Sequence, residues 1–189
     1  MFNDKFSLTQ AVLDGRKTMT RRIVSEKLLD RWTDYDEKDF FLNNAPYKLG
    51  EVVAIAQSYM DVDRFHRKGK NAAYLEYLDS ILPELKLYPG WGNKMFAKAD
   101  LMPHHIEITG IKVERLQDIS DEDCLKEGII HKYTDNDGIK IYHTPHTKRG
   151  YLSTDIPQQA FEFLINKVSG KGIWESNPFV FAYEFRLTD

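Results

Sequence analysis

The sequence is poor in cysteine and has no long apolar run. Its single Cys124 cannot form an internal disulfide, and alone it cannot build a thiolate zinc site. No apolar segment approaches the roughly 20 residues that a membrane span needs, and the first residues, MFNDKFS, lack the basic and then apolar pattern of a signal peptide. We therefore expect a cytoplasmic protein with no membrane partner, stabilised by side-chain packing.

The charge balance excludes further classes of function. Lysine and arginine number 26 against 29 acidic residues, so the formal charge is −3. Tight nonspecific binding of long duplexes needs many phosphate contacts, and this charge argues against it. The sequence has no phosphate-cradling P-loop and no dinucleotide fingerprint, and its six histidines form no three-ligand metal pattern. We therefore predict neither a cofactor nor a metal. One or at most two domains are expected from the length.

Apolar residues at helical spacing, between capping and stop signals, predict four helices, at residues 7–14, 71–82, 121–127 and 157–168. Ser7 opens the first helix with a capping box, and this helix ends just before a basic loop. Pro83 ends the second helix, and Ser120 caps the third. Pro157 suits the first position of the fourth.

Alternating or continuous apolar residues, rich in β-branched and aromatic types, predict three strands, at residues 52–57, 106–116 and 179–187. Gly110 interrupts the second strand with a bulge or sharp bend. Residues 135–138 are typical of a hairpin tip. Because strands and short helices follow one another without regular βαβ alternation, we predict an α+β fold with a small barrel or strongly curved sheet.

The sharpest local feature is a basic segment directly after the first helix. Residues 15–22, GRKTMTRR, hold four cations and two hydroxyls without any acidic residue. Arginine holds phosphate or carboxylate with two parallel hydrogen bonds, and lysine adds a point charge. The segment therefore predicts an anion site, and a solvated basic turn is the alternative that composition leaves open.

Four ordered blocks of the sequence resemble one family. Residues 13–22 resemble the N-terminal signature of ASCH domains, a branch of the PUA-like superfamily of small β-barrels. Residues 47–53, YKLGEVV, are similar to that family's lysine-x-glycine-acid turn into a barrel strand. Residues 113–129 look like its strand followed by a short acidic helix. Residues 174–185 are similar to the closing strand of phage- and prophage-associated members.

The resemblance implies a fold and a ligand class. The fold is a single ASCH/PUA-like domain over residues 1–189, a small β-barrel with short flanking helices. Segments of about 60–98 and 131–155 are insertions that the compact members lack. The superfamily typically handles RNA or modified nucleosides, so the expected partner is RNA, a nucleoside or a nucleotide, held in a cleft floored by residues 16–22. An oligomeric state is not predicted.

The resemblance also implies a catalytic set. One small bacterial member hydrolyses N(4)-acetylcytidine to cytidine and acetate, and its motif positions fall on Lys17, Thr20 and Glu127. Thr20 then serves as nucleophile, Lys17 as base with a lowered pKa, and Glu127 protonates the leaving amine or holds the cytidine edge. If the register of the acidic helix slips, Glu122 or Asp123 takes the place of Glu127. The alternative is a purely structural role, in which Lys17 and Glu127 form an ion pair and Thr20 caps a turn.

Further side chains are candidates for substrate binding. Arg16, Arg21 and Arg22 would hold an anion beside the catalytic set. Trp91 and Lys94 belong to a stretch that interleaves aromatic and basic residues, which suits stacked bases beside phosphates. The alternative for that stretch is a loop whose aromatic rings seal one end of the barrel.

Three functions therefore remain open. The first is an RNA- or modified-nucleoside-binding protein, and the second is an amidohydrolase that deacylates an acylated nucleoside. The third is a phage-related adaptor that binds another protein. A charge of −3 still allows one flipped base or a single-stranded end to be held locally.

Overall fold

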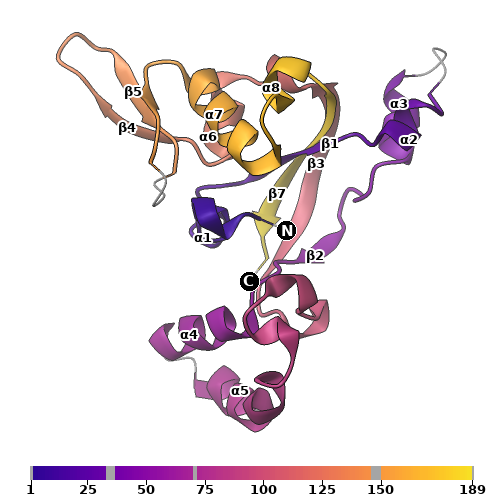
Figure 1. The fold of residues 1–189 in the computed structure, drawn as a ribbon, viewed down its shortest axis with the longest axis vertical. Helices are drawn as coiled ribbons and strands as arrows, with labels where there is room; N and C mark the ends of the chain where they lie inside the picture. Colours follow the sequence, from indigo (N-terminus) through magenta and orange to yellow (C-terminus); the bar gives the residue numbers. More distant parts are fainter. Residues whose placement is uncertain (1, 33–36, 70–71, 146–149, 189) are drawn as a thin grey trace. The chain divides into compact units, whose positions relative to one another are not determined.

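The structure is a computed structural model that describes residues 2–32, 37–69, 72–145 and 150–188 (Figure 1). The chain divides into two compact units. One, here called the helical unit, comprises Met1–Phe2, Val53–Ile106 and Thr188–Asp189. The other, here called the sheet unit, comprises Asn3–Val52 and Glu107–Leu187. The stretch of about 60–98 expected as an insertion lies in the helical unit and that of 131–155 in the sheet unit, although 70–71 and 146–149 fall outside the described residues.

Four strands form a curled antiparallel sheet, in the order β1-β7-β3-β2 (Figure 1). They are β1 (Met19–Ile23), β7 (Phe179–Leu187), β3 (His105–Arg115) and β2 (Val52–Ala54). The α+β class is confirmed, and the three predicted strands share this one sheet, although β2 is shorter than expected. β3 continues through Gly110 instead of breaking there. A Cβ at Gly110 would lie 3.1 Å from Oε2 of Glu184, so the missing side chain leaves room for that neighbour.

Part of the basic segment is a strand, so the prediction of a loop is wrong for residues 19–23. Met19 and Arg21 are buried, whereas Thr20 and Arg22 are half-buried, which is the alternation of a strand with two different faces. The strand escapes prediction because one of its inward positions carries a guanidinium instead of an apolar side chain. A charge at that position hides the period of two that identifies a half-buried strand.

The other elements of the sheet unit are short. They are η1 (Asp4–Phe6), α1 (Leu8–Leu13), α2 (Glu26–Leu29), α3 (Glu37–Asn43), η5 (Leu116–Asp118), α6 (Asp121–Lys126), α7 (Pro157–Ser169) and α8 (Ile173–Ser176). The predicted helices at 7–14, 121–127 and 157–168 are confirmed as α1, α6 and α7. The capping box of α1 is wrong, because Ser7 has a φ of 53° and its side chain makes no capping hydrogen bond. Ser120 does cap α6, by accepting from the Asp123 N–H at 3.2 Å.

A second sheet carries the predicted hairpin. Its strands, in the order β4-β5-β6, are β4 (Ile130–Thr134), β5 (Lys140–His143) and β6 (Ser153–Thr154). At the tip, Oδ1 of Asp135 accepts from the backbone N–H of Asp137 at 3.0 Å and of Ile139 at 2.8 Å. Gly138 adopts a φ of 83°, which suits a tight turn. The hairpin predicted at 135–138 is therefore confirmed.

The four-stranded sheet is covered on both faces within the sheet unit. On one face, the Arg21 guanidinium lies 5.9 Å from the ring centroid of Phe161 on α7. On the other face, Phe41 of α3 packs against Phe179 and Phe181 of β7, with ring centroids 5.9 and 6.4 Å apart. Burial of these rings supplies the apolar core that holds β1 and β7 in place.

The helical unit has a small core of its own. Its elements are α4 (Tyr59–Gly69), α5 (Ala72–Leu85), η2 (Pro89–Trp91), η3 (Lys94–Phe96) and η4 (Ala99–Leu101). Its core consists of Tyr59, Val62, Leu82, Leu85 and Met102. The helix predicted over 71–82 begins at Ala72 and runs through Pro83, so the predicted stop is wrong. The proline lies near the helix end, where it disturbs only the preceding turn. Among the described residues, no helix has the length and apolarity that crossing a membrane requires.

Candidate functional site

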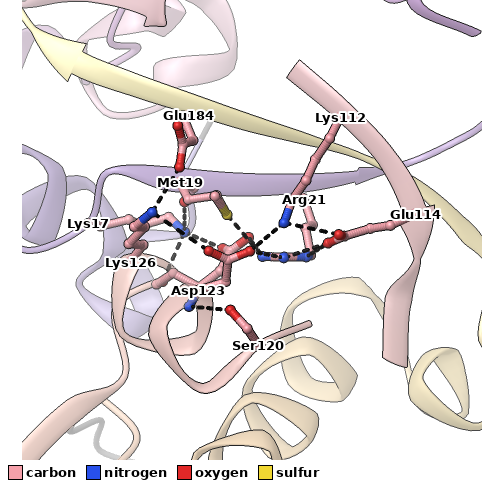
Figure 2. Close-up of polar contacts among 10 residues, drawn as sticks. Lys17, Met19, Arg21, Lys112, Glu114, Ser120, Asp123, Lys126 and Glu184 are labelled. Carbon is pink, nitrogen blue, oxygen red and sulfur yellow. Dashed lines mark hydrogen bonds and ion pairs between the residues drawn. The ribbon is translucent and has the colours of Figure 1, made fainter. Parts of the chain in front are cut away.

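The basic segment faces carboxylates of the protein itself. Figure 2 shows these side chains meeting between the sheet and α6. We call the group the charge cluster and define it by its three cations and three anions: Lys17, Arg21, Lys112, Glu114, Asp123 and Glu127. Because the two signs are equal in number, the charge cluster has no net formal charge.

Lys17 lies at the buried end of the charge cluster, with only 2% of its surface exposed. Its Nζ donates to Oε2 of Glu127 at 2.5 Å, to the Glu127 carbonyl at 2.9 Å and to the Met19 carbonyl at 2.7 Å. These acceptors match the three protons of an ammonium. Burial lowers the pKa of Lys17 below its usual value, and the nearby Arg22 and Arg21 act in the same direction against the attraction of Glu127.

Arg21 joins the three carboxylates. Its Nη2 donates to Oε1 of Glu114 at 2.6 Å and to Oδ2 of Asp123 at 2.9 Å, and its Nη1 lies 3.3 Å from Oε1 of Glu127. Burial alone would lower the pKa of Arg21, but Glu127 and Glu114 outweigh it, so the pKa is raised. A planar fork suits this role, because its fixed and spread donors reach carboxylates that belong to three separate side chains.

Two lysines lie where the charge cluster meets solvent: Lys112, which belongs to the cluster, and Lys126, which lies beside it. Lys112 is partly exposed, and its Nζ lies 2.6 Å from Oδ2 of Asp123 and 3.0 Å from Oε2 of Glu114. Lys126, also partly exposed, donates to Glu184 at 2.8 Å (Figure 2). Burial acts to raise the pKa of Asp123. Lys112 and Arg21 act more strongly in the opposite direction, so the pKa is lowered and this carboxyl is held in its charged form. A ligand arriving from solvent would meet these lysines first.

Local backbone geometry brings the two sides of the charge cluster together. Helix α6 ends at Lys126, and Gly128, with a φ of 106°, then turns the chain beside the Lys17 side chain. The Thr18 N–H then donates to the Lys126 carbonyl at 2.9 Å, so the chain entering β1 is joined to the end of α6. This hydrogen bond explains why Lys17 and Glu127 meet although 110 residues separate them.

Thr20 occupies a different place from the other two members of the predicted catalytic set. It pairs with Tyr183 across the β1–β7 ladder and lies on the strand face opposite Arg21. The hydrogen bonds described for the charge cluster join Lys17 to Glu127 and do not include the Thr20 hydroxyl. The structure therefore brings two of the three residues together, and a role for Thr20 as nucleophile stays a prediction.

The predicted binding residues are also divided. Arg16 is exposed and pairs with Asp14 at 2.9 Å, which fits a solvated turn. Arg22 is half-buried on the face of Thr20. Trp91 and Lys94 belong to the helical unit, where Trp91 packs against the core and Lys94 donates to the Phe2 carbonyl.

Sequence reasoning missed Lys112 and Glu114, and considered Asp123 only as a substitute for Glu127. A weak signal exists for the first two, because two residues apart on one strand they share a face. Asp123 and Glu127 stand four apart at the end of α6, so they also share a face. Among the residues that the structure describes, no group of three or more His, Cys, Asp and Glu is arranged to hold a metal ion.

Searches against protein-family models, curated proteins and solved structures each returned no significant match to this chain. The family resemblance therefore depends on the four sequence blocks, and the function must be argued from the chemistry of the charge cluster.

Proposed function

We propose that this chain is an ASCH-type protein, with a PUA-like half-barrel, that binds a modified nucleoside or a single base of RNA at the charge cluster. The observation that carries the proposal is the 2.5 Å contact between Lys17 and Glu127. These are two of the residues to which the resemblance assigns substrate chemistry. They lie far apart in the sequence, and their meeting supports the proposal. A structural ion pair predicts the same contact, so the binding experiment below decides between the two.

The energetics of the charge cluster support a functional role. Removing charged groups from water is costly, and well-packed apolar residues of similar volume are often as stabilising as a buried ion pair. Charged groups with perturbed pKa values gather at functional sites more than elsewhere. The buried Lys17, whose pKa is lowered, and the buried Arg21, whose pKa is raised, form such a group.

The donors and acceptors of the charge cluster suit a nucleobase edge. A cytosine-like edge presents an exocyclic amine donor next to acceptors, and carboxylates accept from such amines while lysine and arginine donate to ring and carbonyl acceptors. Glu127 accepts from Lys17 and Arg21, which leaves it lone-pair capacity for a further donor. Lys112 and Lys126 on the solvent side would meet a phosphate or ribose.

Binding can be tested directly by calorimetric titration of the purified protein with cytidine, N(4)-acetylcytidine and uridine. We expect Glu127→Gln, which keeps the shape but removes the charge, to weaken binding of the amine-bearing base at least about 10-fold. Arg186→Gln is the matched control, since Arg186 forms an exposed pair with Glu107 at 2.7 Å and lies outside the charge cluster. Equal affinities for wild type and Glu127→Gln, or no nucleoside binding, would refute the proposal, and absence of binding would favour a protein-binding adaptor.

A second candidate function is deacylation of an acylated nucleoside, and the lowered pKa of Lys17 favours it. A lysine that gives up its proton more readily can act as a general base. Glu127, which contacts Lys17, would return a proton to the leaving amine. The hydroxyl of Thr20 would attack the acyl carbon, the cytosine amine would leave with a proton, and water would then hydrolyse the acyl-Thr20 ester to release acetate. If water attacks instead of Thr20, acetate forms without an acyl-enzyme.

Turnover separates the two candidates. If the protein is a hydrolase, incubation with N(4)-acetylcytidine releases cytidine and acetate, and Lys17→Ala and Glu127→Gln each lower the rate roughly 100-fold or more. The same loss in Thr20→Ala with rescue by Thr20→Ser identifies Thr20 as the nucleophile. An unchanged rate in Thr20→Ala identifies water instead. Binding without release of acetate excludes the hydrolase.

A further inference from the structure

Two short turns of the helical unit present aromatic rings to solvent. Tyr88 before η2 and Phe96 at the end of η3 have 55% and 61% of their surface exposed. Leu87 and Met95, their neighbours in sequence, are more exposed still. We call Tyr88 and Phe96 the aromatic surface, which Leu87 and Met95 flank. Single exposed apolar residues are ordinary, but four within ten residues of sequence, on turns that approach each other at Gly90 and Phe96, indicate a surface used for contact.

The backbone beneath the aromatic surface is fixed by packing. A Cβ at Gly90 would lie 2.6 Å from the Tyr59 ring and 2.9 Å from the Phe96 carbonyl oxygen, so η2 packs directly on both. The Tyr59 hydroxyl accepts from the Lys98 N–H at 3.0 Å, and Tyr59 itself belongs to the core of the helical unit. Because the turns are held this way, the exposed rings need little ordering on binding, which favours affinity.

The charge of the same segment points to the kind of ligand. Residues 86–99 contain Lys86, Lys94 and Lys98 but no acidic residue, although the whole chain has a formal charge of −3. Lys86 lies 5.6 Å from the ring centroid of Trp91, and Lys98 is exposed. Exposed aromatic rings can stack on flat apolar groups of a ligand, and nearby lysines attract negative charge. Together they suit a polyanion whose flat groups are accessible. Single-stranded nucleic acid has this character, whereas a duplex hides the faces of its bases.

We infer that the aromatic surface binds single-stranded RNA, with bases stacked on Tyr88 and Phe96 and phosphates beside Lys86 and Lys98. The choice of RNA over DNA rests on the proposed function. The contact residues themselves are independent of it, because none of them belongs to the charge cluster. Stacking tolerates any base, so this surface would provide affinity for a strand without selecting its sequence.

The test measures fluorescence anisotropy of a labelled oligouridine of about ten nucleotides with the full chain. We expect Tyr88→Ala and Phe96→Ala each to raise Kd by about 10-fold, and Tyr88→Phe, which keeps the ring, to change it by less than about 2-fold. Lys86→Ala should reduce the salt dependence of log K by about 0.7. The controls are Leu87→Ala and Tyr133→Ala. Tyr133 has 53% of its surface exposed but belongs to the sheet unit.

Several outcomes overturn the inference. These are no binding of oligouridine, an unchanged Kd in the Tyr88→Ala and Phe96→Ala variants, and a loss in Leu87→Ala as large as theirs. An equal loss of affinity in Leu87→Ala would indicate apolar packing, as in a protein–protein interface, instead of base stacking. Titration of the same variants with free nucleosides separates this inference from the proposed function. Weaker RNA binding at Tyr88→Ala together with no nucleoside binding supports the aromatic surface and refutes only the charge cluster as a nucleoside site.

Discussion

Replacing Arg21 with methionine is the most direct test of how the charge cluster is balanced. Methionine keeps much of the length and apolar volume of the side chain but removes the guanidinium that contacts three carboxylates. Two cations, Lys17 and Lys112, would then face three anions. Breaking a buried ion pair from one side typically costs about 3–5 kcal/mol, because the remaining charge is left desolvated and unpaired. We expect a loss of that size in the free energy of unfolding at pH 7.

The pH dependence of that loss follows from the carboxyl groups. The pKa of Asp123 lies below its ordinary value of 3.8 in the folded protein. A carboxyl with a lowered pKa stabilises the fold above its unfolded pKa, and this contribution disappears as pH falls through the folded pKa. Arg21 is one cause of the lowered pKa. The difference between wild type and Arg21→Met should therefore be full at neutral pH and should shrink as pH falls below about 3.8.

The assay is urea unfolding followed by circular dichroism at several pH values between 7 and 3. Arg21→Lys keeps the charge but loses the fork, so it should lose about 2 kcal/mol, less than Arg21→Met. Arg186→Met is the surface control, because its exposed pair with Glu107 should contribute no more than about 0.5 kcal/mol. A loss below about 1 kcal/mol in Arg21→Met, or a loss that stays constant down to pH 3, would refute this account of the charge cluster.

Two further predictions concern single positions, Cys124 and Gly90. Burial raises the pKa of Cys124 to about 12, so its thiol should react with a disulfide reagent at pH 8 only as fast as the protein opens; immediate reaction would contradict this. Gly90→Ala places a methyl 2.6 Å from the Tyr59 ring and should lower the free energy of unfolding by about 1–3 kcal/mol, whereas Gly92→Ala, with open space around its Cβ, should change it little. Equal urea midpoints for these two variants would show that the close approach at Gly90 has no energetic weight.

Apolar pattern and turn chemistry predicted much of the fold. Residues 179–187 read as a strand because aromatic and aliphatic side chains run together, and this strand is indeed β7 in the middle of the sheet. The hairpin at 135–138 follows from Asp135 and Gly138, whose local chemistry dictates the turn. These signals work because the interactions that fix each element lie within a few residues.

Elements fixed by distant partners escaped prediction. β1 has an inward-facing Arg21, and its charge is acceptable there only because Glu114 and Asp123 arrive from other parts of the chain. The same reason explains the charge cluster. Its Lys17 and Glu127 were reached through the family resemblance, whereas nothing local to Lys112 or Glu114 shows that they complete it. Helix α4 was not predicted, because its five charged residues outnumber its four apolar ones and obscure the helical period.

The pairing of β1 with β7 has a consequence for the order in which the protein folds. β1 lies at the edge of its sheet, and its hydrogen-bonded neighbour β7 is the last strand along the chain. During synthesis, residues 17–22 leave the ribosome long before β7 or Glu127 has been made, so their cations stay solvated until then. Closing so long a loop is entropically costly and slow. The sheet and its interior charges therefore assemble late, and the N-terminal segment depends on the C-terminal strand for its native structure.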